Sequence, residues 1–253
     1  MNSEQSPGAD GWGLPSTEDT GTSVGQDVLA VQFAELARSF QMQSDPAATL
    51  RDIVSSAIRL IPGVDEGSIS VVLARKTVMS QVPSGALPRI VDALQEETGQ
   101  GPCLDAVYEQ ETVRVSDMST EQRWPKFSAR AAEAGAAGML SLQLYVEGDN
   151  LGAVNLYARR SGALNDESEH VGRLFAAHAG VAYAAAKKEA DLDQALQTRE
   201  LIGQANGILM ERHRITAQQA FTLLVAASQR RQIKLRDLAE DLVLSGTLDE
   251  GQQ

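Results

Sequence analysis

Cysteine and histidine, which carry much of the chemistry of enzyme active sites, are scarce in this sequence. Its 253 residues include one cysteine, Cys103, and three histidines. A single cysteine excludes a disulfide within the chain and is compatible with a reducing compartment. There is no Gly-rich phosphate loop or nucleophile triad, and His170 and His178 are eight residues apart, whereas helical metal pairs need three or four. We therefore expect no enzyme activity, no metal site and no cofactor.

The sequence also lacks long apolar runs and has fewer basic residues than acidic ones. No stretch approaches the roughly 20 apolar residues of a membrane span, and no basic start with an apolar run follows Met1. We therefore expect no signal peptide, no membrane partner and a cytoplasmic location. The chain has 22 Lys and Arg against 34 Asp and Glu, a net charge of -12. This balance argues against a protein that coats nucleic acid along its whole surface.

The sequence does contain enough apolar residues to form cores. They make up 43% of the chain, and 253 residues have room for two modest domains with linkers. Residues 1–26 are different, because they are rich in Ser, Gly, Pro, Thr and acids and contain no Lys or Arg. We predict a disordered acidic tail there, and a second short tail over 249–253.

Helical and strand patterns alternate through the middle of the chain. Apolar spacing predicts helices over 27–43, 46–61, 87–97, 102–108, 124–135 and from Asp166 onward. Strands are predicted over 68–73, 77–82, 112–115, 141–146 and 152–157. Turn residues at 75–76 and 147–150 join the first two and the last two strands. This order predicts an α+β domain with helices packed on an antiparallel sheet of about five strands.

Three further helices are predicted in the last fifth of the chain. The first runs to about Glu211, the second opens at Thr216 and the third covers 235–245. Thr216 and Gln219 form a capping-box pattern, and Gly246 is a C-terminal stop. Connections this short predict a compact three-helix unit.

This three-helix unit is basic although the chain is acidic. Between Arg199 and Arg236 there are seven Lys and Arg residues and two acids, a local excess of five positive charges. Basic groups near helix ends are able to bind the phosphate backbone of a nucleic acid. Binding is favourable because it releases the counterions condensed on the nucleic acid. On charge alone, a solvated surface whose cations stabilise helix ends explains the pattern equally well.

A resemblance to a known family favours the first explanation. It is carried by Ile202-Gly203-Gln204-Ala205-Asn206-Gly207-Ile208-Leu209-Met210, then Ala220-Phe221, Leu224 and Leu235…Leu238-Ala239. These residues resemble the ANTAR domain, a three-helix RNA-binding output domain of bacterial transcription antiterminators. The resemblance implies binding to paired stem-loops in nascent mRNA leaders, which prevents a terminator hairpin from forming. Asn206 stands where many members carry Lys, a change that bears on RNA affinity more than on the fold.

Charge and resemblance together predict the residues that touch RNA. We expect cations to contact phosphate and amides to read base edges in loops. This set is Arg199, Gln204, Asn206, Arg212, Arg214, Arg230, Arg231 and Lys234. A second set should shape and support the surface: Ala205, Gly207, Met210, Ala220 and Phe221.

Two motifs in the α+β region resemble GAF domains, which sense ligands or signals. They are Gly99-Gln100-Gly101-Pro102-Cys103-Leu104-Asp105-Ala106 and Leu151-Gly152-Ala153-Val154-Asn155-Leu156-Tyr157. We therefore assign 27–187 to a GAF-like sensor, with its core at about 46–187, and 188–248 to the ANTAR domain with a helical linker. The resemblance is compatible with an unknown small-molecule ligand. The cyclic-nucleotide pattern of GAF domains is not matched, because Leu156 follows Asn155 and Leu164 replaces Phe.

Cys103 allows two interpretations. It follows Pro102 at the start of a predicted helix, and a helix N-terminus lowers a thiol pKa, which would suit a redox sensor. The alternative is a small buried residue. A bilin is not expected, because Leu104 stands where such sites carry His. A sensor pocket would draw on six residues, for which plain core packing is the alternative: Cys103, Tyr108, Met118, Trp124, Phe127 and Tyr145.

The joint between the two domains is predicted to be helical, because Val181–Met210 contains no Pro and only two Gly, both late. A seven-residue rhythm runs along it, too short to identify a coiled coil by itself: Leu192, Leu196, Arg199, Gly203, Asn206 and Met210. Since bivalent RNA binding needs two copies, we predict a parallel homodimer along this helix. An ordinary amphipathic connector is the alternative.

Two other functions remain open. The three helices could bind duplex DNA as a helix-turn-helix variant, or the basic patch could bind an acidic protein in a signalling module. Competition between a hairpin RNA and its DNA equivalent separates RNA binding from DNA binding. A protein-interaction module would show no salt-dependent RNA affinity.

Overall fold

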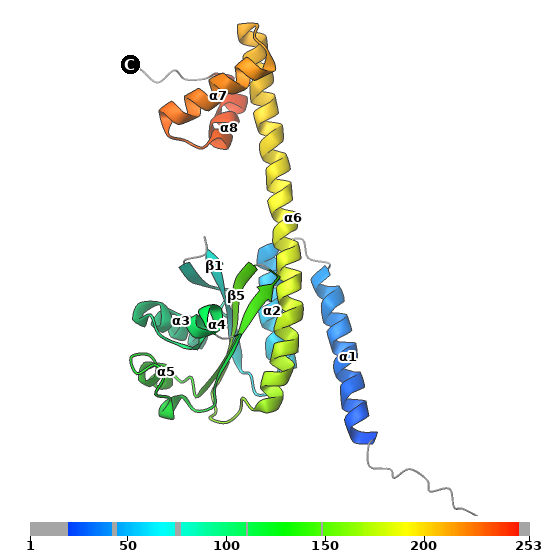
Figure 1. Cartoon of the computed structure of the whole chain (residues 1–253), viewed down its shortest axis with the longest axis vertical. Coiled ribbons are helices and arrows are strands. Elements are labelled where there is room, and N and C mark those ends of the chain that lie inside the picture. The colour runs from blue at the N-terminus through cyan, green and yellow to red at the C-terminus, as the bar shows by residue number, and fades with distance from the viewer. Residues whose placement is uncertain (1–19, 42–44, 74–76, 110, 148, 248–253) are drawn as a thin grey trace, which may run out of the picture.

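One long helix joins the two parts of the protein. The structure is a computed structural model, and it describes residues 20–41, 45–73, 77–109, 111–147 and 149–247. Figure 1 shows α6 (Asp166–His213) rising from a helix-covered sheet to a small helical unit at its far end. With 48 residues at 1.5 Å each, α6 is about 72 Å long. The predicted helical joint is therefore confirmed, since sensor and output share a single helix.

The sensor part is built on a five-stranded antiparallel sheet, as predicted. Its strands follow the order β2-β1-β5-β4-β3. They are β1 (Glu66–Leu73), β2 (Thr77–Gln81), β3 (Thr112–Val115), β4 (Gly138–Val146) and β5 (Asp149–Ala158). Two antiparallel pairs adjacent in the chain, β1–β2 and β4–β5, supply four strands, and β1 pairs with β5 to join them. The α+β class and the strand positions are confirmed.

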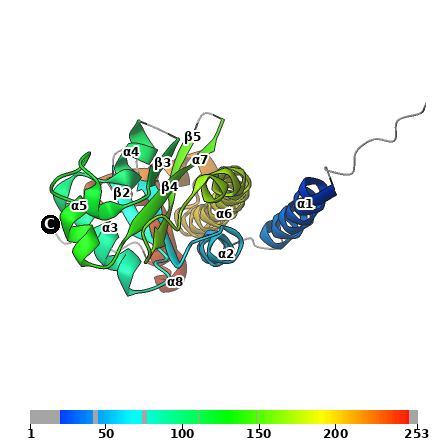
Figure 2. The ribbon, with the colours of Figure 1, turned by 90° about the horizontal axis from the view of Figure 1, so that it is seen from below.

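Helices cover both faces of this sheet, because successive side chains of a strand point to opposite faces. One face packs against α2 (Pro46–Leu60) and the first half of α6, with α1 (Thr20–Gln41) on the outer side of that pair, as Figure 2 shows. The opposite face packs against α3 (Ala86–Thr98), α4 (Pro102–Tyr108), the short η1 (Met118–Thr120) and α5 (Ser128–Glu133). The sheet thus has two separate cores.

Local sequence signals explain where several of these helices begin and end. The Asp45 carboxylate accepts hydrogen bonds from the N–H groups of Ala47 and Ala48 at 3.1 Å, which caps α2. Gly101 has a φ of +141°, and a Cβ there would lie 2.4 Å from Gln95 Oε1. The same oxygen accepts the N–H of Cys103 at 2.8 Å, so the glycine lets Gln95 cap α4.

Several predicted boundaries differ from the structure. Strand β4 begins at Gly138 and not at 141, and β5 begins at Asp149, within the predicted turn at 147–150. Helix α1 begins at Thr20, so residues 20–26 belong to a helix and not to the acidic tail. The rest of that tail, the tail over 249–253 and the turn at 75–76 lie outside the described residues. Helix α5 is shorter than the predicted 124–135, because the Trp124 carbonyl accepts from Phe127 at 3.0 Å in a turn that precedes it.

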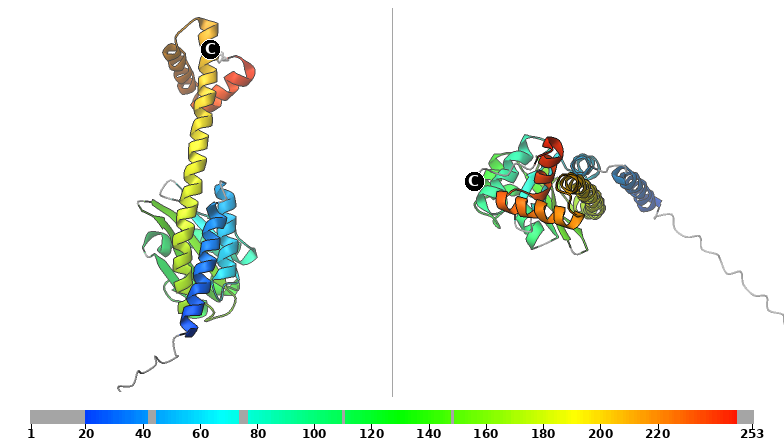
Figure 3. Two further views of the ribbon diagram at one scale, coloured as in Figure 1. Left: turned by 90° about the vertical axis from the view of Figure 1, so that its right-hand side faces the viewer. Right: turned by 90° about the horizontal axis from the view of Figure 1, so that it is seen from above.

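The output part is a three-helix unit made by the end of α6, α7 (Ala217–Arg231) and α8 (Leu235–Ser245). In the left view of Figure 3 α7 and α8 flank the far end of α6, and Figure 1 shows that both lie on the same side of it, where the three helices share one core. The Thr216–Gln219 capping box is present, and Gly246 ends α8 with a φ of +68°. The core of the unit consists of Ala205, Leu209, Ala220, Leu224, Ala227, Leu238, Ala239 and Leu242.

Candidate nucleic-acid interface and sensor core

The predicted RNA-binding cations lie on the surface of the output unit, at three places. Arg212 and Arg214 are at the α6–α7 connection, and Arg230, Arg231 and Lys234 are at the α7–α8 connection. Arg199 is further back along α6. All six side chains are exposed. The fold therefore divides the local positive charge between both connections and the α6 stem.

Several of these groups have partners within the chain. Arg214 pairs with Glu211 at 3.4 Å on the surface, and the Arg212 guanidinium donates to the carbonyl of Gly246 after α8. Gln204 donates to Glu200 at 3.3 Å. Asn206 is half-buried, and within the described residues its Oδ1 is buried with no hydrogen-bond partner. Arg212 thus has a structural contact in addition to its predicted role.

The residues predicted to support this surface divide into two groups. Ala205 and Ala220 are fully buried in the core of the output unit. Gly207 is exposed, and a Cβ there would meet nothing within 4 Å. Met210 and Phe221 are 37% and 38% exposed, although their helical spacing predicts inward positions. The apolar surface offered by the unit is therefore larger than the sequence pattern indicates.

Four of the six predicted sensor-pocket residues pack together in the core between the sheet and α3–α5. Cys103, Met118, Trp124 and Phe127 are at most 5% exposed, whereas Tyr108 and Tyr145 are 56% and 52% exposed. Burial raises the pKa of the Cys103 thiol to about 11. Of the two interpretations of Cys103, this burial fits the small buried residue, because desolvation of the thiolate outweighs the lowering of the pKa by a helix N-terminus.

A polar network crosses this same core, and the sequence analysis missed it. The Asp92 carboxylate on α3 accepts hydrogen bonds from the Tyr157 hydroxyl on β5 and the Ser80 hydroxyl on β2. Nearby, Ser141 donates to Asn155 at 2.9 Å, and Asn155 donates to Ser70 at 3.0 Å. Burial raises the pKa of Asp92 and raises that of Tyr157 well above its ordinary value.

One signal in the sequence could have indicated this network. Ser68 and Ser70, and likewise Asn155 and Tyr157, are two residues apart on predicted strands, so each pair must share a face. Asp92, which accepts from Tyr157, is on a helix, and only the tertiary packing brings it to the sheet. The network attaches α3 to β2 through the exposed Ser80 and to β5 through the fully buried Tyr157.

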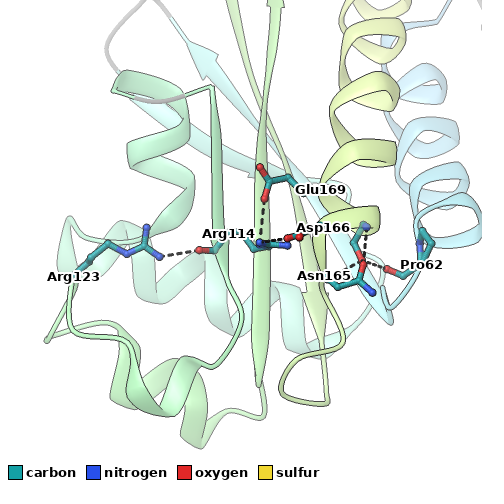
Figure 4. A network of polar contacts seen from close by, with 7 residues as sticks. Pro62, Arg114, Arg123, Asn165, Asp166 and Glu169 are labelled. Atoms are coloured by element: carbon teal, nitrogen blue, oxygen red, sulfur yellow. Dashed lines mark hydrogen bonds and ion pairs between the residues drawn. The ribbon is translucent and has the colours of Figure 1, made fainter.

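The start of α6 is fixed to the sheet by a second polar cluster, drawn in Figure 4. Arg114 on edge strand β3 pairs with Asp166 at 2.7 Å and Glu169 at 3.2 Å, both in the first turn of α6. Asn165 caps the helix, and the Ser168 hydroxyl donates to the Pro62 carbonyl at 2.8 Å. These contacts attach the first turn of α6 to the edge strand of the sheet and to the loop after α2.

Arg114 is in turn connected to the core that holds Cys103. Arg123 donates to the Arg114 carbonyl at 2.9 Å, and its guanidinium lies 4.4 Å from the centre of the Trp124 ring. The Trp124 indole donates to Asp105 on α4 at 3.0 Å. Contacts therefore run continuously from α4 to the start of α6.

A groove of about 820 Å³ lies beside this cluster, between the β3–β4 edge and α6. Arg114, Glu169, His170, Arg173 and Tyr145 are among the residues that line it. In the described part of the chain, no group of three or more His, Cys, Asp or Glu residues could hold a metal ion. No described helix is long and apolar enough to cross a membrane.

The sheet, the long helix and the basic helical unit together define a protein with a sensor part and an output part. Comparison with protein families identifies both: the GAF domain matches residues 43–184 and the ANTAR domain matches residues 190–243. The chain belongs to the GAF domain family, with an ANTAR domain after the GAF domain. A GAF domain implies signal sensing, and an ANTAR domain implies RNA binding and antitermination.

The solved structures to which this chain is similar share little sequence with it. A free methionine-R-sulfoxide reductase from Neisseria meningitidis is 14% identical, with 70% of this chain and 98% of that chain covered and a TM-score of 0.49. The GAF domain of an Acinetobacter phosphoenolpyruvate-protein phosphotransferase is 13% identical, with 65% and 98% covered and a TM-score of 0.49.

A third similar structure is the second GAF domain of DevS from Mycobacterium smegmatis. It is 20% identical, with 58% of this chain and 99% of that chain covered and a TM-score of 0.45. Likeness at these levels carries no argument about ligand or activity. A comparison with curated proteins found no match to the chain.

Proposed function

We propose that this protein is a signal-responsive transcription antiterminator that binds paired stem-loops in nascent mRNA leaders as a parallel homodimer, without catalysing a reaction. The observation that carries the proposal is the continuity of α6, whose first turns are fixed to the GAF sheet and whose last turns form the ANTAR core. A change at the sheet edge is thus transmitted along one rigid element to the RNA-binding unit.

The surface of α6 supports a dimer along this helix. Residues 191–197 are exposed all round the helix, and Leu192 and Leu196 are 57% and 63% exposed. Water-exposed leucines on such a stretch of helix favour packing against a second copy. In a parallel dimer both output units lie at the same end of the paired α6 helices, where they can bind two stem-loops of one RNA at once.

Signalling then requires two arrangements of the α6 pair. A ligand that binds the GAF domain can change the populations of the two arrangements only if it binds one arrangement more tightly than the other. We expect one arrangement to place the two basic units at the spacing of two stem-loops and the other not to. The RNA affinity of the dimer would report which arrangement is populated.

The test of RNA binding reverses two charges at the α6–α7 connection. Arg212→Glu with Arg214→Glu should abolish binding of a hairpin RNA in a gel-shift titration, because cations facing phosphate become anions. The matched control is Arg89→Glu with Arg160→Glu, which makes the same charge change on exposed arginines of the sensor. Because Arg212 also contacts Gly246, circular dichroism must show that the helices remain folded.

Two outcomes would contradict the proposal. Equal binding by the charge-reversed protein and its control would remove the α6–α7 connection from the interface. Stronger binding to the DNA duplex of the same sequence than to the hairpin RNA would favour a DNA-binding regulator.

A further inference from the structure

The groove between the β3–β4 edge and the first turns of α6 has no part in the function proposed above. Its volume of about 820 Å³ is within the range of about 300–1,000 Å³ typical of ligand sites. Glu111, Thr112 and Arg114 line it at the sheet edge, and the wall formed by α6 extends from Asp166 to Ala177. A molecule in this groove would therefore contact both the sheet and the helix that leads to the output unit.

This groove lies on the opposite face of the sheet from the core that holds Cys103. Leu142, which lines the groove, belongs to the core between the sheet and the α2–α6 pair, whereas Cys103 belongs to the core under α3–α5. Helix α6 packs on β4, so Thr112 and Arg114 on the edge strand β3 are only half-buried. The groove is thus separate from the core in which the sensor pocket was predicted.

Two groups of opposite charge in this groove are unpaired. Arg114 pairs with Asp166 and Glu169. Arg173 on α6 and Glu111 before β3 are both exposed, and neither forms an ion pair or a side-chain hydrogen bond with another described residue. The groove therefore presents a free cation from one wall and a free carboxylate from the other.

Separated charges of both signs favour a ligand that carries both signs. A simple anion would be attracted by Arg173 but repelled by the carboxylates of Glu111, Asp166 and Glu169, and a simple cation would be repelled by Arg173 and Arg114. A molecule with a carboxylate at one end and an ammonium group at the other can pair with both free groups. Charge-assisted hydrogen bonds of this kind are stronger than neutral ones.

The groove also offers apolar surface to such a ligand. Leu142 on β4 and Ala177 on α6 line it, and a third lining residue, Leu174, is 42% exposed. An apolar side chain of the ligand would cover Leu174 and remove both apolar surfaces from water. His170, which also lines the groove, can donate a hydrogen bond to a carboxylate.

Two other occupants fit this groove less well. A partner strand would need the outer edge of β3, where the Arg123 guanidinium already donates to the Arg114 carbonyl at 2.9 Å. A second copy paired along α6 through its exposed leucines does not cover Arg173. At 3.6 residues per turn, Arg173 lies roughly 100° around the helix from Leu192 and roughly 140° from Leu196.

We propose that the groove between β3 and α6 binds a free amino acid or a short peptide with an apolar side chain, with its carboxylate on Arg173 and its ammonium group on Glu111. A ligand that contacts both walls holds the first turns of α6 against the sheet edge. The binding site is independent of the proposed function, and only its effect on RNA binding rests on that function.

Isothermal titration calorimetry of the full-length protein tests binding. The probes are the proteinogenic amino acids and a set of dipeptides with apolar side chains, titrated up to millimolar concentration. We expect at least one probe to bind. Its N-acetylated and C-amidated forms, which each lack one charge, should bind roughly 5-fold more weakly, the upper end for an ion pair exposed to water. No binding by any probe would overturn the proposal.

Two substitutions test which residue holds each charge. Arg173→Gln should abolish the difference in affinity between the best probe and its C-amidated form, and Glu111→Gln should abolish the difference between that probe and its N-acetylated form. The matched controls, Arg160→Gln and Glu96→Gln, remove the same charges from exposed residues outside the groove and should preserve both differences. Preservation of both differences in Arg173→Gln and Glu111→Gln would also overturn the proposal.

The place of binding is tested with a probe that carries a photoreactive diazirine on its apolar side chain. Crosslinks should fall on peptides from 111–115 or 166–177. Crosslinks confined to α3–α5 would place the ligand in the core on the other face and contradict the proposal. A changed oligomeric state of Arg173→Gln in analytical ultracentrifugation, with probe binding unchanged, would assign the groove to a contact between copies and contradict it as well.

Gel-shift titration with a hairpin RNA separates this inference from the proposed function. The probe should change the RNA affinity of the wild type and not that of the double variant Glu111→Gln with Arg173→Gln. A probe that binds in the groove and leaves the RNA affinity unchanged would support the site and refute its effect on the output unit. A wild type that binds no hairpin RNA with or without the probe would contradict the proposed function, and calorimetry would still decide the site.

Discussion

Asp92 is a buried carboxylate whose protonation is linked to the stability of the sensor. It is 6% exposed, and burial raises its pKa although hydrogen bonds from Ser80 and Tyr157 oppose this shift. Because the folded state holds the proton more tightly than the unfolded state, the stabilisation is fully present below the unfolded pKa. It is lost as the pH rises through the folded pKa.

The first prediction follows from the direction of this pKa shift. Asp92→Asn cannot ionise, and its amide can still accept from Tyr157 and donate to Ser80. As the pH rises above about 4, the free energy of unfolding of the wild type should fall relative to that of Asp92→Asn. The slope is at most about 1.4 kcal/mol per pH unit. Urea unfolding from pH 4 to pH 8 measures it, and parallel curves for the two proteins would contradict the prediction.

At the scale of the element, α6 contains two glycines that the single chain does not require. Gly203 and Gly207 are helical and exposed, and a Cβ at either position would meet nothing within 4 Å. Glycine in a helix interior costs about 1 kcal/mol relative to alanine. This cost has no explanation in the packing of one chain, whereas close approach of RNA or of a second helix would require these glycines.

The second prediction is therefore that stability and binding change in opposite directions. Gly203→Ala and Gly207→Ala should each raise the free energy of unfolding by about 1 kcal/mol and weaken RNA binding. Chemical denaturation and gel-shift titration measure the two quantities. Higher stability with unchanged RNA affinity would remove this face of α6 from the interface.

The third prediction concerns the attachment of α6 to the sheet. Arg114→Ala removes both ion pairs to the first helical turn, so it should lower the free energy of unfolding by about 1 kcal/mol and speed amide exchange in that turn. Arg130→Ala is the matched control, because it breaks the Arg130–Glu97 pair, 2.9 Å long, between α5 and α3. Equal rates of amide exchange in the first turn of α6 in the two variants would show that Arg114 does not stabilise that turn.

At the scale of the whole molecule, the exposed stretch of α6 between the domains predicts how affinity depends on assembly. Leu192→Glu with Leu196→Glu should make the protein monomeric in analytical ultracentrifugation, because four acidic side chains would meet across a parallel dimer. Its affinity for RNA with two stem-loops should then fall roughly 10²- to 10⁴-fold, to the level of a single stem-loop.

The control for this fourth prediction is Met79→Glu with Ile90→Glu. These residues are 42% and 48% exposed and lie on β2 and α3, away from α6. The control should keep the oligomeric state and the RNA affinity of the wild type. A protein that is monomeric before any substitution, yet still prefers two stem-loops, would refute the dimer.

Local signals in the sequence were sufficient for the order of elements and for both domains. Asp45-Pro46, Thr216 with Gln219, and Gly246 act through hydrogen bonds and φ angles of the neighbouring backbone, so their effects do not depend on distant parts of the chain. The absence of Pro between Val181 and Met210 likewise predicted the unbroken helix that the structure contains. These features belong to the sequence alone.

Other properties were decided only by the tertiary structure. Phe221 and Met210 have helical spacing that indicates inward positions, but the crossing of α7 and α8 over α6 leaves both partly exposed. The raised pKa values of Asp92 on α3 and Cys103 on α4 arise from burial between these helices and the sheet, and at Cys103 this burial overrides the local effect of a helix start. The reason is physical: capping and turn energies act within a few residues, whereas desolvation and exposure depend on which elements pack together.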